Sequence, residues 1–268
     1  MRIGNREFVE AGKTYVMGIL NITPDSFSDG GKWKDLDTAL FHVEEMLKDG
    51  MDLLDIGGES SRPGHTPISA KEETERVLPV LEAVKSRFDI PVSLDTCKEE
   101  VAKAGINAGV DLINDIWGLK QDTGMAKLIA DSGLPCCLMH NRGEAVYQDF
   151  FTEVKADLRE SLAIADRAGI PRERILLDPG VGFGKTYEQN LKILHHLELF
   201  SELGCPLLLG TSRKSVIGLT LNLPVDERVE GTLATTALGV MKGCTFVRVH
   251  DVRENVRLIR MLEAILHS

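Results

Sequence analysis

The sequence predicts an α/β fold, a (β/α)8 TIM barrel with a short N-terminal hairpin extension. Eight short apolar segments recur at intervals of tens of residues, and each ends in a polar or charged residue before a turn rich in Gly, Pro or Ser. Segments of helical periodicity lie between them and are long enough to connect parallel strands. The chain has 268 residues, close to the about 250 residues of one such barrel. We therefore expect a single domain over residues 1–268.

The first element is expected before the barrel. Residues 1–14 contain the turn pairs Gly4-Asn5 and Ala11-Gly12, which favour a small hairpin that could close the bottom of the barrel. The eight barrel strands are then predicted at Tyr15–Asn21, Met51–Gly58, Pro91–Thr96, Leu112–Ile116, Pro135–His140, Ile175–Gly180, Pro206–Gly210 and Thr245–His250.

Helix starts and ends follow these strands in order. Capping boxes, in which a hydroxyl and an acidic or amide side chain satisfy exposed amide donors, are predicted at Ser69–Glu72, Thr96–Glu99 and Thr186–Gln189. Long polar loops over 22–35 and 59–69, after the first two strands, are typical of lids or binding loops. Glycines that would close a helix in left-handed geometry precede six of the strands, at Gly50, Gly109, Gly133, Gly169, Gly204 and Gly243.

In this fold the carboxyl ends of all strands share one mouth, where active sites lie. The polar side chains expected to converge there are Asn21, Asp55, Asp95, Asn114, His140, Asp178, Arg248 and His250. A second set of residues just past strand ends would make the mouth cationic and favour an anionic ligand. These are Arg62, Lys185, Arg213, Lys214 and Arg248, with His250.

The composition excludes several classes of protein. Hydrophobic residues make up 43% of the chain and charged residues 27%, which is enough to enclose a large core and excludes disordered and fibrous classes. The net charge of −10 disfavours nonspecific nucleic-acid binding. No apolar run approaches the about 18 residues that cross a bilayer, and Met1–Gly12 lacks the apolar centre of a signal peptide. We expect a cytoplasmic protein with no membrane partner.

The five cysteines show no C-x-x-C spacing, so a zinc site or a disulfide framework is not expected. The adjacent Cys136 and Cys137 lie inside a predicted strand, where thiols behave as small hydrophobic side chains. The Gly-rich segment Asp178–Lys185 is not a phosphate-binding loop, since Pro179 and Lys185 stand where the known patterns require glycine. Its glycines could let the backbone approach a flat ligand, or could simply form a tight turn.

Four segments carry a specific pattern: Asn21–Gly31, Gly57–Gly64, Asp178–Lys185 and Gly210–Ser215. Together with Arg248-Val249-His250, and in this order, they resemble the dihydropteroate synthase family over essentially the whole chain. The resemblance implies a (β/α)8 barrel that joins 6-hydroxymethyl-7,8-dihydropterin pyrophosphate to 4-aminobenzoate, releasing pyrophosphate. It also implies Mg²⁺ as cofactor, inhibition by sulfonamides that imitate aminobenzoate, and a homodimer.

The resemblance assigns the pterin contacts to residues at strand ends. An ionised Asp178 would accept hydrogen bonds from the amino group and ring N–H of the pterin. Lys214 would donate to the opposite edge, and Phe183 would present an apolar ring. Asp95 and Asn114 would complete the edge contacts. The alternative for the two aspartates is helix capping, since both precede predicted helix starts.

The other two groups of contacts are assigned in the same way. Pyrophosphate would lie against Arg248 and His250, and Asn21 would bind Mg²⁺ or a phosphate oxygen. Ser61, where the common family pattern has threonine, and Arg62 would add donors from the second loop. Ser215 would hold the carboxylate of aminobenzoate at a helix start. The ring of aminobenzoate would lie among Phe27, Pro63 and the methylenes of Lys214.

The resemblance also implies a mechanism. Loss of pyrophosphate would leave positive charge on a methylene that the dihydropterin delocalises, so a dissociative displacement is expected. The residues with catalytic roles would be Asp25, Arg62, Lys214, Arg248 and His250. Two alternatives stay open: a pterin-binding methyltransferase domain acting on methyltetrahydrofolate, and a noncatalytic pterin-binding protein. The loops Asn21–Gly31 and Gly57–Gly64 favour the synthase, because a methyl transfer has no pyrophosphate to hold.

Overall fold

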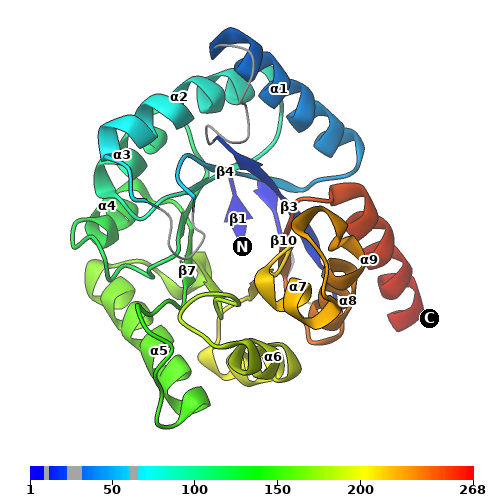
Figure 1. Ribbon diagram of the computed structural model, residues 1–268. Helices are drawn as coiled ribbons and strands as arrows, with labels where there is room; N and C mark the ends of the chain where they lie inside the picture. Colours follow the sequence, from blue (N-terminus) through cyan, green and yellow to red (C-terminus); the bar gives the residue numbers. More distant parts are fainter. Residues whose placement is uncertain (9–11, 23–31, 61–65) are drawn as a thin grey trace.

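The computed structural model confirms the (β/α)8 barrel (Figure 1). It describes residues 1–8, 12–22, 32–60 and 66–268, and the side chains of 32–35 are not described. The parallel strands lie in the order β8-β7-β6-β5-β4-β3-β10-β9, and a bridge between Leu177 and Leu207 joins the two ends of the sheet. They are β3 Tyr15–Asn21, β4 Leu53–Gly57, β5 Val92–Asp95, β6 Leu112–Asp115, β7 Cys136–Met139, β8 Ile175–Asp178, β9 Leu208–Gly210 and β10 Phe246–Val249.

All eight strands lie where the sequence predicts them, and most are shorter by one to three residues. The outer ring of Figure 1 is formed by helices that cover the strands. They are α1 Lys32–Lys48, α2 Ala70–Arg87, α3 Glu99–Asn107, α4 Met125–Ser132, α5 Phe150–Ala168, α6 Tyr187–His195, α7 Ser215–Leu221, α8 Val229–Met241 and α9 Val252–Leu266. Short 3-10 turns occur at η2 Arg172–Arg174, η3 Leu197–Leu203 and η4 Val225–Glu227.

Two of the three predicted caps are confirmed. The Ser69 hydroxyl accepts the N–H of Glu72 at 3.1 Å at the start of α2. At the start of α6 the capping box is complete, with the hydroxyl of Thr186 and the side chain of Gln189 each accepting a backbone N–H. All six glycines predicted to precede strands have positive φ, between +70° and +98°.

The predicted box at Thr96 is wrong. Helix α3 begins at Glu99 with Lys98 as its N-cap, and no side chain of the cap residue bonds to the helix. The Thr96 hydroxyl instead accepts the N–H of Lys98 at 3.3 Å. The amide of Glu99 donates to Asp122 at 2.8 Å. A carboxylate from the next loop thus satisfies the helix amide, and a local sequence pattern does not reveal it.

The predicted N-terminal hairpin closes the bottom of the barrel. Strands β1 Arg2–Ile3 and β2 Arg6–Glu7 pair antiparallel, and β1 is visible through the centre of the ring in Figure 1. Ile3 and Phe8 are 0% and 3% exposed and join an apolar cluster inside the barrel. The Phe8 ring lies 4.8 Å from that of Tyr15 and 5.2 Å from that of Phe246, centroid to centroid. This packing seals the end of the barrel opposite the mouth.

The adjacent cysteines pack as hydrophobic side chains, as predicted. Cys136 and Cys137 are fully buried, and burial raises the pKa of both thiols above the ordinary value. All five cysteines are free. The four other than Cys97 are buried, so these belong to the packing of the barrel.

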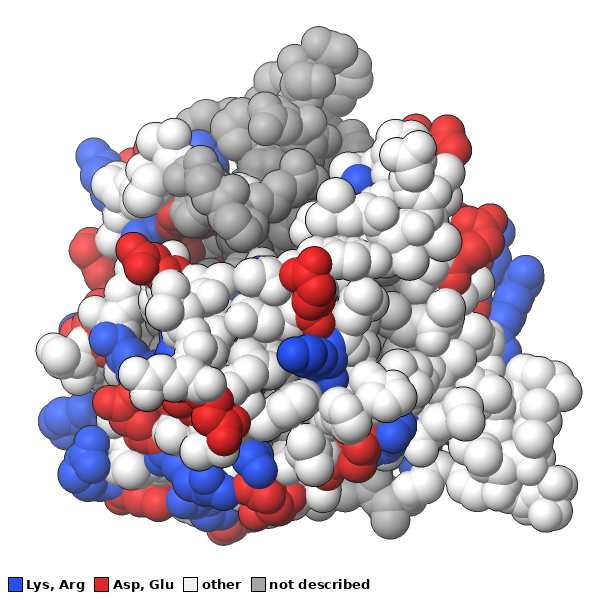
Figure 2. All heavy atoms as spheres, turned by 60° about the horizontal axis from the view of Figure 1, so that its bottom comes forward, with Lys and Arg blue, Asp and Glu red and all other residues white. Residues whose placement is uncertain are grey.

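One face of the molecule carries charged side chains of both signs (Figure 2). In Figure 2 the Lys and Arg side chains lie among the Asp and Glu side chains. On the face shown, the coloured residues form no large patch of a single charge. None of the described helices is both long and apolar enough to cross a membrane.

Candidate active site

The polar side chains of the mouth stand above the apolar layer that seals the barrel. Side chains two residues apart on a strand face the same side, so an inward apolar residue is followed by an inward residue nearer the mouth. This periodicity explains why groups distant in sequence converge. The pairs are Leu53 with Asp55, Leu112 with Asn114, Leu176 with Asp178, Leu208 with Gly210 and Phe246 with Arg248.

Arg248 lies at the centre of the site and binds two carboxylates. Its Nε donates to Asp55 Oδ2 at 2.6 Å and its Nη2 donates to Asp95 Oδ2 at 2.7 Å. The side chain of Asp55 is 0% exposed and that of Arg248 is 15% exposed, so this is a buried ion-pair cluster. The amide of Asn114 lies 3.5 Å from Asp55 Oδ2. Strands β4, β5, β6 and β10 therefore present their side chains to one point, as the sequence predicts.

Burial and shared charge shape the titration of this cluster. Burial raises the pKa of Asp95 to about 7; the guanidinium of Arg248 lowers it, and the nearby Asp55 raises it. Burial alone would lower the pKa of Arg248, but the two carboxylates keep it above its ordinary value. Among the described residues, Asp55 Oδ1 has no hydrogen-bond partner. Because two carboxyl groups share one guanidinium, this side of the mouth carries a net negative charge when both are ionised.

A second group comes from the segments after β8 and β9. Asp178 Oδ1 accepts the N–H of Gly180 at 2.7 Å. Lys214 donates to the carbonyl oxygen of Val181, and its Nζ lies 4.1 Å from the centroid of the Phe183 ring. Burial lowers the pKa of Lys214 to about 8, with the opposing attraction of Asp178. An anion, a cation and an aromatic ring thus lie next to one another, as a polar heterocycle requires.

The capping alternative is not supported for either aspartate. The N-cap of α3 is Lys98, and that of α6 is Thr186. Asp95 binds Arg248, and Asp178 bonds within its own turn. Both carboxylates remain available to the mouth instead of closing a helix.

Two glycines leave space in the rim between these groups. Gly57 lies in register with Asn21 on one side and Asp95 on the other. A Cβ at Gly57 would lie 3.6 Å from Asn21 Oδ1 and 3.6 Å from Asp95 Cβ. A Cβ at Gly210 would lie 3.4 Å from Asp178 Oδ2. The absence of a side chain at these positions leaves this part of the rim open.

His250 and Ser215 flank the mouth on the side of β9 and β10. The backbone N–H of His250 donates to the Ser212 hydroxyl at 3.1 Å, and its ring Nδ1 lies 3.0 Å from the same oxygen. Ser215 is exposed and is the first residue of α7, as predicted. In the chain His250 lies two residues after Arg248, and Ser215 directly follows Lys214.

The prediction of a cationic mouth is wrong for the described residues. Arg213 forms an ion pair with Asp251, at 2.5 and 3.1 Å. Lys185 turns inward, with its Nζ 2.7 Å from His140 Nδ1. With Arg248 also paired, positive charge is balanced locally. Any attraction for an anionic ligand must come from particular donors and not from an excess of cations.

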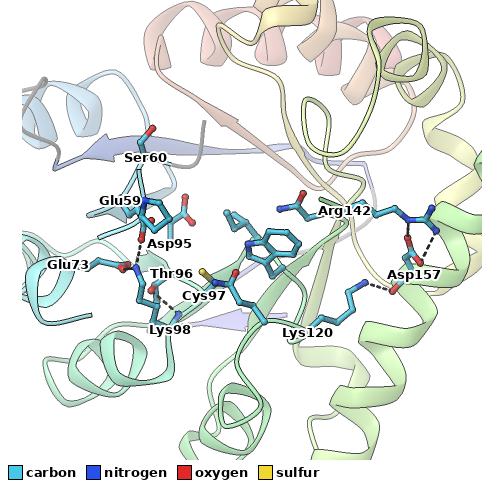
Figure 3. A pocket seen from close by; sticks show the side chains of 15 residues that line it. Glu59, Ser60, Glu73, Asp95, Thr96, Cys97, Lys98, Lys120, Arg142 and Asp157 are labelled. Atoms are coloured by element: carbon cyan, nitrogen blue, oxygen red, sulfur yellow. Dashed lines mark hydrogen bonds and ion pairs between the residues drawn. The ribbon is translucent and has the colours of Figure 1, made fainter. Parts of the chain in front are cut away.

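A cavity of about 510 Å³ opens beside Asp95 (Figure 3). On one side Lys98 bonds to Glu59 and Glu73, and on the other Arg142 bonds to Asp157. Of the predicted pterin contacts, only Asp95 lines it. The lining residues are Glu59, Ser60, Pro67, Glu73, Asp95, Thr96, Cys97, Lys98, Ile116, Trp117, Lys120, Gln121, Asn141, Arg142 and Asp157.

Sequence reasoning missed most of this lining. Lys98 and Trp117 lie two or three residues beyond the ends of β5 and β6, and this position past a strand end was the available signal. Asp157 projects from α5, and no strand marks it. Asp55 was expected to converge at the mouth but was given no role, although it is the most buried partner of Arg248.

Comparison with known proteins identifies the family. Residues 17–250 match the model of the pterin binding enzyme family. Over 267 residues the chain is 57% identical to the dihydropteroate synthase of Clostridium beijerinckii, and the match covers 99% of each chain. The chain belongs to the dihydropteroate synthase family. The similarity to named synthases over the full length favours this family over the methyltransferase alternative.

Solved dihydropteroate synthases have the same fold. The enzyme of Clostridium difficile, crystallised in the presence of pteroic acid, is 47% identical with a TM-score of 0.95, covering 98% of this chain and all of that one. The enzyme of Xanthomonas albilineans with 4-aminobenzoic acid is 43% identical with a TM-score of 0.91, covering 96% of this chain and 94% of that one.

Five of the residues that the resemblance singles out lie outside the described residues, so their assignments stay predictions. They are Asp25, Phe27, Ser61, Arg62 and Pro63. All other predicted site residues surround the mouth described above.

The described residues fit Mg²⁺ only together with a phosphate ligand. No cluster of three or more His, Cys, Asp or Glu able to hold a metal occurs in the described ranges. Mg²⁺ often keeps several waters and binds one or two protein oxygens plus substrate phosphates. The space above Gly57 leaves the amide oxygen of Asn21 facing the mouth, as one such ligand requires.

Proposed function

We propose that the protein condenses 6-hydroxymethyl-7,8-dihydropterin pyrophosphate with 4-aminobenzoate to give 7,8-dihydropteroate and pyrophosphate, a step of folate biosynthesis. The single observation that carries this proposal is the convergence of Asp95, Asn114, Asp178 and Lys214 around Arg248 in a member of this family. Pteroic acid and 4-aminobenzoic acid, present with the two solved relatives, correspond in chemistry to the product and to the second substrate.

The pterin is bound by its polar edges. Asp178 accepts from the amino group and the adjacent ring N–H, a paired arrangement that only an ionised carboxylate offers. Lys214 donates to the carbonyl edge. The Phe183 ring, which already contacts Lys214 Nζ, covers one face of the heterocycle. Asp95 and Asn114 meet the remaining ring nitrogens. An analogue that lacks these partners would leave buried polar groups unpaired and be rejected.

The diphosphate lies near Arg248 and His250, with Ser61 and Arg62 as further donors. A Mg²⁺ ion held by Asn21 and the diphosphate would supply additional neutralisation of the leaving group. Arg248 is prepared for this role because Asp55 and Asp95 fix the orientation of its guanidinium. A donor fixed before the reaction stabilises developing charge without reorganisation at that moment.

The reaction is a dissociative displacement. The bond between the methylene carbon and the diphosphate oxygen breaks, and the electron pair leaves with pyrophosphate. Asp25 stabilises the resulting cation. The aniline nitrogen, which attacks as the free amine, then forms the new C–N bond, and its extra proton passes to solvent. Ser215 holds the aminobenzoate carboxylate, and Phe27, Pro63 and the Lys214 methylenes contact its ring.

The protein is also proposed to be a cytoplasmic homodimer. Large apolar side chains remain exposed on the last helices, as an interface would use. Leu219, Met241 and Met261 are 67%, 65% and 62% exposed. Sedimentation equilibrium would give the mass of the assembly, and a monomer at all concentrations would contradict the dimer.

The activity is tested with calorimetry and a pyrophosphate-release assay. The wild-type protein should bind pterin pyrophosphate and release pyrophosphate only when aminobenzoate is added. Binding without release would instead support the noncatalytic pterin-binding protein. Methyl transfer from methyltetrahydrofolate, with no pyrophosphate release, would support the methyltransferase alternative.

A further inference from the structure

A row of charged and polar groups adjoins the Gly-rich turn of the proposed pterin site and has no part in the mechanism above. It consists of Lys185, His140, Asp157 and Arg142. Lys185 Nζ lies 2.7 Å from His140 Nδ1, and His140 Nε2 lies 3.0 Å from Asp157 Oδ2. Arg142 Nε donates to the same Asp157 oxygen at 2.6 Å (Figure 3). The row joins the end of the Gly-rich segment after β8 to α5.

Lys185 fixes the Gly-rich turn that it follows. Its Nζ donates to the carbonyl oxygens of Gly180 and Phe183, each at 2.9 Å. Together with His140, these are three acceptors for the three protons of the ammonium group. The turn between them contains glycines at φ +70°, +87° and +54°, a conformation that a chain adopts at little cost only with glycine. Lys185 thus adds to the backbone hydrogen bond within the turn, from the N–H of Phe183 to the carbonyl oxygen of Gly180 at 3.1 Å.

The tautomer of His140 follows from its two neighbours. Because Lys185 donates to Nδ1, the proton of the neutral ring is on Nε2 and is donated to Asp157. Burial lowers the pKa of His140 to about 4, which keeps it neutral and able to accept. Burial would raise the pKa of Asp157, but hydrogen bonds from His140 and Arg142 lower it below the ordinary value. The row therefore alternates cation, neutral ring, anion and cation.

Three proposed pterin contacts depend on the position of this turn. Asp178 bonds to the amide of Gly180, Phe183 is part of the turn, and Lys214 donates to the carbonyl of Val181. The turn is held from a second side by Tyr147, whose hydroxyl donates to the carbonyl of Gly184 at 2.6 Å. A shift of the turn would displace an anion, an aromatic ring and a cation together.

We propose that Lys185, oriented by His140 and Asp157, is a positioning residue that holds the turn 180–184 in the conformation that binds the pterin. This inference rests on the proposed function, because it assigns the turn to pterin recognition. Displacement of a recognition group by about 1 Å can cost about a hundredfold in efficiency. Removal of Lys185 should therefore weaken pterin binding far more than the binding of aminobenzoate.

The principal test compares Lys185→Met with the wild-type protein and with Lys192→Met. Lys192 is an exposed lysine on α6, close in sequence and not a member of the row, and is the matched control. Calorimetry with pterin pyrophosphate should show a dissociation constant raised about 10- to 100-fold in Lys185→Met and changed less than about twofold in Lys192→Met. KM for pterin pyrophosphate should rise more than KM for aminobenzoate. An unchanged dissociation constant, or equal rises in both KM values, would overturn the inference.

A pH series separates positioning from a general loss of structure. Burial lowers the pKa of Lys185 to about 7; the facing Asp178 and Asp157 raise it, and Lys214 and Arg142 lower it. The wild-type ammonium therefore loses a proton, and one of three hydrogen bonds, as pH rises through 7. The ratio of the two dissociation constants, Lys185→Met over wild type, should fall between pH 6 and pH 9. Because both proteins bind the same ligand, protonation of the ligand affects both dissociation constants equally and cancels in their ratio. A ratio that stays constant with pH would contradict the inference.

A milder variant covers the case in which Lys185→Met does not fold. Tyr147→Phe removes only the hydroxyl bonded to Gly184 and should raise the dissociation constant of pterin pyrophosphate severalfold with thermal stability nearly unchanged. Wild-type binding of pterin pyrophosphate is measured first. If the wild-type protein does not bind it, the proposed function fails; if it binds and neither variant weakens binding, only the present inference fails.

Discussion

Replacement of Arg248 by methionine is the sharpest test of the buried ion-pair cluster. Removing one partner of a buried ion pair costs about 3–5 kcal/mol of stability, because the other charge stays buried without compensation. Here Arg248 bonds to two carboxylates, and the side chains of Asp55 and Asp95 are 0% and 10% exposed. We therefore expect Arg248→Met to lower the free energy of unfolding at pH 8 by about 5 kcal/mol, the upper end of that range.

This loss should shrink on acidification. Burial raises the folded-state pKa of Asp95 to about 7, above the value of 3.8 of an ordinary aspartate, and Arg248 opposes this rise. A carboxyl group whose pKa is raised by folding stabilises the protein below its ordinary pKa, and this contribution is lost as pH rises through the folded pKa. Without Arg248 the pKa rises further. A rise of one unit makes the loss at pH 5 about 1 kcal/mol smaller than the loss at pH 8, and further rises add little because the carboxyl group is then protonated at pH 8 as well.

Urea denaturation at pH 8 and pH 5, followed by circular dichroism, measures both quantities. Arg253→Met is the matched control, since Arg253 bonds to Asp49 at 2.8 Å and its side chain is 51% exposed. An exposed pair contributes about 0–1 kcal/mol, so the control should change little at either pH. A loss below about 1 kcal/mol for Arg248→Met at pH 8, or an equal loss at both pH values, would refute the reasoning.

Three further predictions concern the mouth, the N-terminal hairpin that closes the bottom of the barrel, and the loop after β3. Gly57→Ala should fold, because its added Cβ would lie 3.6 Å from atoms of Asn21 and Asp95, an ordinary contact distance. The extra methyl group should crowd a bound ligand and raise KM for pterin pyrophosphate about tenfold. An unchanged KM would show that no ligand occupies this space. Phe8→Ala should lower the free energy of unfolding, measured in urea, by about 3–5 kcal/mol and leave kcat at low temperature unchanged. A loss of kcat would contradict a purely structural role for the N-terminal hairpin. Asp25→Ala should slow turnover much more than it weakens pterin-pyrophosphate binding by calorimetry, and equal losses would count against its role in stabilising the cation.

The fold was predictable because its signals are local and repeated. Strand positions follow from short apolar segments, and glycines such as Gly169 mark helix ends by a conformation that other residues rarely adopt. The identity of the mouth residues followed from the same repeat, since all strand ends of a barrel meet. The failed cap at Thr96 shows the limit, because the carboxylate that replaces it comes from the next loop.

Pairing of charges was not predictable in the same way. Arg213 and Asp251 are 38 residues apart, and Arg248 and Asp55 are 193 apart. A sequence shows that a cation follows a strand but not which acid the fold places opposite it. The expected cationic mouth was therefore wrong, whereas the expectation that Arg248 faces inward was correct.

The two rim glycines have a consequence for inhibition. A molecule bound above Gly57 and Gly210 would contact the backbone of these residues. A side-chain substitution elsewhere in the protein cannot remove a backbone contact. Substitution of either glycine would add atoms to the space in which we propose that the pterin binds. A compound confined to that space would be difficult to escape by a single mutation, because the change that expels the drug also excludes the natural substrate.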